Sequence, residues 1–165
     1  MKNYKSWKAL KQKLEDLLCD ELKGHITYFL TRYHKVHDSY GRAAIVMDKT
    51  ELVRFSWIEM YNQESDMSRL YEQTGEYDEK RFKEKWDEDC TYYEMDFIAA
   101  ALEFTDMKIR DALCSDNYII RIFAVMDRRV GKRTLQKIKD ENEYAALPDW
   151  VSRFYKLRLE AAGIM

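Results

Sequence analysis

Apolar residues at three- and four-residue steps open the chain and predict an amphipathic helix over residues 3–22. The apolar stripe of this segment consists of Trp7, Leu10, Leu14, Leu17, Leu18 and Leu22. Lysine and acidic residues fill most positions between them and are expected to face water. Gly24 follows the last apolar position, where a helix commonly ends.

Beyond Gly24 the pattern changes to short runs of β-branched and aromatic residues, which predict strands. We expect three strands, over residues 25–36, 42–47 and 51–61, joined by polar turns at 37–41 and 48–50. Tight turns between consecutive strands indicate an antiparallel meander. The N-terminal helix is expected to cover one face, because a lone sheet must bury its apolar side. A three-stranded sheet also leaves an edge, which could accept a strand from a partner.

After the meander the helical period returns, and we expect about five helices. Asp78, Asp106 and Asp116 are suitable N-caps for three of them, and Pro148 suits the first turn of the last. The sequence therefore predicts a single α+β domain in which all elements share one core. Its range is residues 1–165, with the helix and meander in 1–61 and the helical part in 62–165.

The composition fits one soluble domain with a sizeable core. Of the 165 residues, 46% are hydrophobic, and only one is proline. The formal net charge of −2 favours neither wholesale nucleic-acid binding nor binding to a membrane surface. The first residues lack the apolar core of a signal peptide, and no stretch holds the roughly 20 apolar residues of a membrane span. We therefore expect a cytoplasmic protein without membrane contact.

The cysteines and histidines indicate neither a disulfide framework nor a metal centre. Cys19, Cys90 and Cys114 are widely separated, and we interpret them as small buried residues in a reducing compartment. His34 and His37 lie three residues apart, a spacing that points them to opposite faces of a strand. A metal site borne by the turn is the lesser alternative, so we predict no metal and no cofactor.

The densest cationic stretch contains Arg128, Arg129, Lys132 and Arg133. Four cations within six residues suit a phosphate backbone or an acidic partner. The alternative is a solvated junction between two helices, in which the neighbouring Asp127 pairs locally. We therefore treat these four residues as candidate partner- or phosphate-binding residues.

A second candidate surface lies in the predicted meander, where aromatic residues alternate with arginines. Its candidate binding residues are Tyr40, Arg42, Trp57 and Glu59. Aromatic and arginine side chains on one sheet face suit protein interfaces and also base stacking. The alternative is that the aromatic rings cover the core while the arginines line the wet face. Glu59 stands on an aromatic face, where a carboxyl group can have a raised pKa and work as an acid.

Four segments carry a resemblance: residues 5–10, 26–42, 55–60 and, above all, 127–135, which read DRRVGKRTL. They resemble a family of small uncharacterised bacterial proteins, and the resemblance spans nearly the whole chain. It implies a bacterial cytosolic protein. It carries no activity, cofactor or catalytic residue over to this chain.

These features lead to a functional hypothesis: a non-enzymatic module that binds another protein, as an adaptor or as an inhibitor-like or immunity-like domain. No catalytic geometry is recognisable, while the aromatic and arginine residues and the short sheet favour an interface. Nucleic-acid binding through residues 128–139 is the first alternative. The second is an enzyme with a site near Glu59 and His34. Partner identity and oligomeric state are left open.

Overall fold

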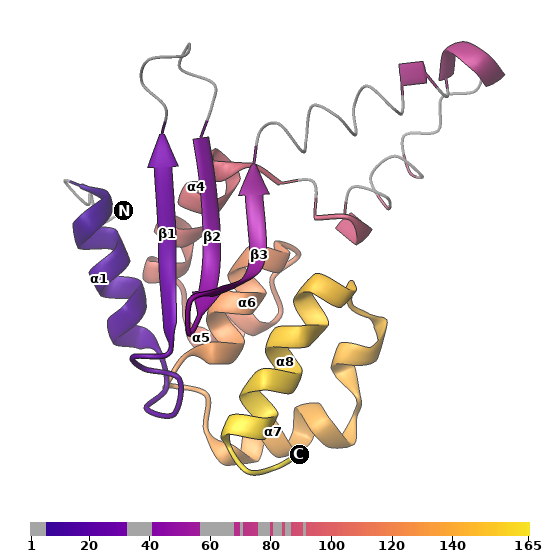
Figure 1. Cartoon of the computed structure of the whole chain (residues 1–165). Coiled ribbons are helices and arrows are strands. Elements are labelled where there is room, and N and C mark those ends of the chain that lie inside the picture. The colour runs from indigo at the N-terminus through magenta and orange to yellow at the C-terminus, as the bar shows by residue number, and fades with distance from the viewer. Residues whose placement is uncertain are drawn as a thin grey trace.

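The computed structural model describes residues 6–32, 41–56, 68–69, 71–75, 80, 84, 87–90 and 92–165 (Figure 1). Within these ranges the chain forms an N-terminal helix, a three-stranded antiparallel sheet and then a series of helices. The predicted α+β architecture is therefore confirmed. The predictions for the turn at 37–40, for the strand after Ser56 and for a cap at Asp78 lie outside the described residues.

Helix α1 (Trp7–Leu17) is shorter than the predicted segment 3–22. Ser6 caps it through a side-chain oxygen that accepts a backbone hydrogen bond. The predicted stripe is buried at Leu10, Leu14 and Leu17. The helix ends there because the backbone of the next residue, Leu18, pairs with Asp127 in an isolated antiparallel bridge. A contact distant in sequence therefore ends the helix before its apolar pattern does.

The sheet consists of β1 (Ile26–Arg32), β2 (Gly41–Met47) and β3 (Thr50–Ser56), in that order and antiparallel throughout. Asp48 and Lys49 form the turn between β2 and β3, with φ angles of 47° and 71°. Two successive residues with positive φ make a tight hairpin turn whose twist matches that of the strands. The predicted meander and its second turn are confirmed.

A series of helices follows the sheet along the chain. They are α4 (Glu94–Asp106), α5 (Ile109–Leu113), α6 (Tyr118–Met126), α7 (Lys132–Asp140), the 3₁₀ helix η1 (Glu143–Ala146) and α8 (Asp149–Ala161). Figure 1 shows α4 and α6 behind the sheet, with α1 beside β1. Aromatic rings join the two layers: Phe97 of α4 stacks on Phe55 of β3 with ring centroids 5.3 Å apart. Phe123 of α6 meets Tyr28 of β1 edge-on at 5.6 Å.

Three of the predicted helix starts are displaced. Asp106 ends α4 and does not cap α5, whose N-cap is Lys108. Asn117 caps α6 one residue after the predicted Asp116, and its side-chain oxygen accepts hydrogen bonds from two backbone amides. Pro148 is the N-cap of α8, one position before its first turn. Asn and Asp cap helices about equally well, so neighbouring candidates cannot be separated by residue type.

Side chains bind some of the backbone groups on the two edge strands of the sheet. On the β1 edge, Glu15 of α1 accepts a hydrogen bond from the Tyr28 amide at 3.4 Å. On the β3 edge, Nη1 of Arg153 donates to the Leu52 carbonyl at 2.6 Å. The thiol of Cys90 donates to a second β3 carbonyl at 3.8 Å. Occupied edge groups are not available to a partner strand.

A second, smaller core fixes α5 against α7 and α8. Its buried members are Val130, Leu135 and Leu159, and Ile109 and Leu113 of α5 pack against them. A helix as short as α5 has little stability of its own, so this packing holds it in place. One face of α5 consequently lies beside one face of α7.

Candidate functional site

The predicted cationic junction is organised around one buried carboxylate. Asp127 directly follows α6, and its side chain is 0% exposed. Its Oδ1 accepts hydrogen bonds from the amide of Arg129 at 2.7 Å and from Nε of the same residue at 3.0 Å. Its Oδ2 accepts a third from Nη2 of Arg129 at 2.8 Å. This two-pronged pairing raises the pKa of Arg129, chiefly through the hydrogen bond to Asp127.

The backbone around Asp127 is tied to the end of α1. The amide of Cys19 donates to the Met126 carbonyl at 2.9 Å, and the amide of Arg128 donates to the Leu17 carbonyl at 2.8 Å. The predicted local pairing of Asp127 is confirmed, but the junction is not solvated at this residue. The segment joins the first helix to the helical layer, which no property of the local sequence indicates.

The four cations of the junction lie in different surroundings. Arg129 pairs with Asp127, and its guanidinium lies 5.8 Å from the centre of the Phe104 ring. Arg128 and Lys132 are exposed. Arg133, in the first turn of α7, lines a groove between α7 and α5. Of the four cations, Arg133 is the one that lines this groove.

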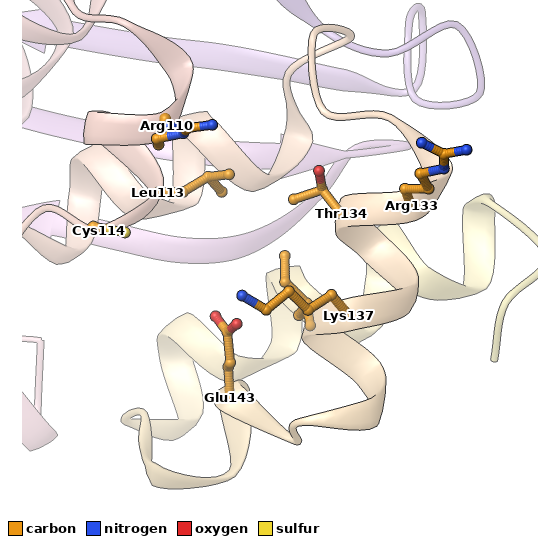
Figure 2. A pocket seen from close by; sticks show the side chains of 8 residues that line it. Arg110, Leu113, Cys114, Arg133, Thr134, Lys137 and Glu143 are labelled. Carbon is orange, nitrogen blue, oxygen red and sulfur yellow. The ribbon is translucent and has the colours of Figure 1, made fainter.

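This groove has a volume of about 530 Å³, within the range of ligand sites. Its lining residues are Arg110, Leu113, Cys114, Arg133, Thr134, Lys137, Ile138 and Glu143. Figure 2 shows α5 contributing one wall and α7 the other, with Glu143 at one end. The half-buried Leu113 and the buried Ile138 give the groove an apolar floor. We call this hollow the α5–α7 groove.

Positive charge dominates the α5–α7 groove. Arg110 and Arg133 make no ion pair with any residue in the described part of the chain. Lys137 lies 3.7 Å from Glu141, but both side chains are more than half exposed, so their pairing is weak. Figure 2 shows the Lys137 amine and the Glu143 carboxylate pointing toward each other, with Arg133 at the opposite end. The groove thus has an excess of cations, and its single carboxylate lies at one end.

The three cysteines differ in exposure, which corrects one expectation. Cys114 is exposed at the C-cap of α5 and lines the groove, so it is not a small core residue. Cys19 and Cys90 are buried, as expected. Burial raises the pKa of the Cys19 thiol. Cys114 is therefore the accessible thiol of the chain.

The candidate surface in the meander is described at one residue only. Arg42 lies on the outer face of β2, where its guanidinium lies 5.2 Å from the centre of the Phe29 ring and pairs with Glu51. It does not line the α5–α7 groove. The other candidates, Tyr40, Trp57 and Glu59, lie outside the described residues.

Among the described residues, no three His, Cys, Asp or Glu side chains gather in a way that could hold a metal ion. No helix in the described ranges is long and apolar enough to cross a membrane.

Sequence reasoning missed most of the groove. Arg110, Cys114, Thr134 and Glu143 were not among its candidate residues, and Arg133 was chosen for charge density alone. One signal was present, because Arg133 and Lys137 are four residues apart and therefore share a helix face. Nothing in the sequence places Arg110 opposite that face, since the packing of α5 on α7 determines it.

Of the comparisons with known proteins, the comparison with family models found a match. Neither the curated proteins nor the solved structures include a match to the chain. The model of the SF0329 protein family matches residues 6–159, a range that begins at the cap of α1 and ends within α8. The chain therefore belongs to the SF0329 protein family.

Proposed function

We propose that the protein is a non-enzymatic interaction module of the bacterial cytosol that binds another protein through the α5–α7 groove. It would act as an adaptor or as an inhibitor-like or immunity-like domain. The observation that carries the proposal is that Arg110 of α5 and Arg133 and Lys137 of α7 line one hollow, which also has an apolar floor. A concave site with cations along its walls and an apolar base is the kind of surface that a partner's side chains fill.

The edge groups that side chains occupy favour the groove over the sheet edges as the contact surface. Arg153 and Glu15 hold edge groups of β3 and β1, so strand addition is not the favoured mode of binding. By contrast, Arg110 and Arg133 have no ion-pair partner among the described residues, so their guanidinium groups can pair with carboxylates of a partner.

Nucleic-acid binding through residues 128–139 is the second candidate. The exposed Arg128 and Lys132 favour it, because exposed cations are what a phosphate backbone requires. The pairing of Arg129 with Asp127 weighs against it, since that guanidinium is already engaged. The bond from Nζ of Lys139 to the Ile164 carbonyl, 2.7 Å long, engages another cation of the segment.

Site-directed cross-linking tests the proposal. A photoreactive amino acid replaces Thr134 in the groove, and in a matched control it replaces Lys8, which is exposed on α1. In cells that encode the protein, light should attach a discrete protein to the Thr134 position and not to the Lys8 position. Identical products from both positions, or no protein product from Thr134, would contradict the proposal. A nuclease-sensitive product would favour the second candidate.

A further inference from the structure

The α5–α7 groove has three features that together restrict the chemistry of its ligand: cations on two walls, an apolar floor and one carboxylate at its end. Each feature selects a different part of a ligand. Rigid guanidinium groups recognise carboxylates through paired hydrogen bonds. An apolar floor selects an apolar side chain, which a purely electrostatic site would not do.

The cations supply the first selection. Arg110 stands on α5 and Arg133 on α7, so the two walls can hold separate carboxylates of one ligand. Neither arginine has an ion-pair partner among the described residues, so no existing pair has to break when a ligand binds. The hydroxyl of Thr134, which lies on the α7 wall, can donate a further hydrogen bond.

The floor supplies the second selection. Ile138 is 3% exposed, and Leu113 packs against the second core and stays partly exposed. This floor is therefore rigid, and it lies between the two cationic walls. An apolar side chain placed between acidic residues would bury its surface there while its neighbours reach the arginines.

Glu143 supplies the third selection. Its carboxylate points toward Lys137 at one end of the groove and repels a continuous row of negative charges that extends past it. A nucleic-acid strand carries such a row, whereas a peptide can end its acidic run or place a neutral residue there. Like-charge repulsion thus favours a short acidic segment over a polyanion.

We infer that the ligand of the α5–α7 groove is a short acidic peptide segment with an apolar side chain between its carboxylates. This inference rests on the proposed function and gives the chemistry of the partner. Arg110 and Arg133 bind the carboxylates, Leu113 and Ile138 receive the apolar side chain, and Glu143 excludes longer polyanions.

Fluorescence anisotropy with defined probes tests this inference. The main probe is a fluorescent peptide in which one leucine is flanked on each side by two glutamates. One matched peptide has glutamine in place of every glutamate, and another has serine in place of leucine. The polyanion probe is an oligothymidylate long enough for its phosphates to extend past Glu143 at the end of the groove. Each probe is titrated with the full-length protein at several salt concentrations.

We expect the glutamine peptide to bind at least about tenfold more weakly than the main probe, because charge-assisted hydrogen bonds are lost. The serine peptide should also bind more weakly. The double variant Arg110→Gln/Arg133→Gln should bind the main probe about tenfold or more weakly than the wild type does. The matched control Arg128→Gln/Lys132→Gln changes the net charge equally outside the groove, and it should stay within about twofold of the wild type.

The variant Glu143→Gln separates peptide from polyanion. This variant should raise the affinity for oligothymidylate by about threefold. Its affinity for the main probe should rise by a smaller factor. Equal affinity for the glutamate and glutamine peptides, or tighter groove-dependent binding of oligothymidylate than of peptide, would overturn the inference. The altered peptides are titrated with wild-type protein, so they test the acidic-segment inference even where a protein variant fails to fold.

The two proposals fail separately. If the Thr134 position cross-links to a protein while the peptides bind without discrimination, the acidic-segment inference falls and the interaction function stands. If the Thr134 position yields no protein product and no peptide binds, both fall.

Discussion

The carboxylate of Asp127 is fully buried and receives three hydrogen bonds from Arg129, whose own side chain is 38% exposed. The two partners therefore differ in what they lose when they separate. Arg129 can turn toward water, whereas Asp127 would stay in the interior as an unpaired charge. Because the neighbouring backbone bonds to the end of α1, this pair stabilises the junction between the first helix and the helical layer.

The Asp127–Arg129 pair predicts an unequal response to substitution. Arg129→Gln should lower the free energy of unfolding by about 3 kcal/mol, because it leaves a buried carboxylate without its cation. Asp127→Asn should cost less, about 1–2 kcal/mol, because it removes the buried charge itself. Urea unfolding at neutral pH measures both values.

The double variant provides the control for that prediction. Arg129→Gln combined with Asp127→Asn should be more stable than Arg129→Gln alone, since no buried charge remains. Equal costs for the two single variants and a simply additive double variant would mean that the two side chains do not interact energetically.

Much of the fold could be predicted from the pattern of the sequence. The meander is predicted by the alternation around Val53 and Phe55 and by the turn at Asp48. Helix α1 is predicted by the leucine stripe. The exact ends depend on distant contacts: α1 stops where Leu18 pairs with Asp127, which no local pattern contains. The hydrogen bond to the Leu52 carbonyl on the β3 edge comes from Arg153, which lies far along the chain from β3.

The candidate site was less accessible to sequence reasoning. Charge density identified Arg133, but it also selected Arg129, which is engaged with Asp127. Cys114 was expected in the core because cysteine is among the most buried residue types, yet it stands at the exposed end of α5. Arg110 joins the site only because a small apolar core packs α5 on α7.

The β3 edge gives a second prediction. Arg153→Ala removes the hydrogen bond to the Leu52 carbonyl and exposes that edge group, which should cost about 1 kcal/mol of unfolding free energy. The freed edge should also increase self-association at high concentration. Lys156→Ala, an exposed change on the same helix, is the matched control. Urea unfolding and light scattering that do not distinguish the two variants would contradict the prediction.

The buried Tyr28 predicts a loss of stability in alkali. Burial raises the pKa of Tyr28 above its ordinary value of 10.0, so the folded chain keeps this proton at a pH where the unfolded chain loses it. The unfolded state then binds fewer protons, and the free energy of unfolding falls as pH rises above 10.0.

Tyr28→Phe removes this titrating group. Above the pKa of the unfolded tyrosine, the free energy of unfolding of the variant should therefore fall by about 1.4 kcal/mol less per pH unit than that of the wild type. The ring and its packing on Phe123 are kept, so the variant should still fold. Urea unfolding over a series of alkaline pH values gives the slopes. An unchanged slope in Tyr28→Phe would assign the alkaline sensitivity to other groups.

The accessible thiol in the α5–α7 groove gives the most direct test of the central claim, that this groove binds an acidic segment. Cys114 lines the groove and is exposed, while Cys19 and Cys90 are buried, so iodoacetamide should modify Cys114 first. The measurement is the rate of Cys114 alkylation with increasing amounts of the glutamate–leucine peptide. Our account predicts that saturating peptide slows the reaction in the wild type and in Arg128→Gln/Lys132→Gln, but not in Arg110→Gln/Arg133→Gln. An alkylation rate in the wild type that does not change at the highest peptide concentration would contradict it.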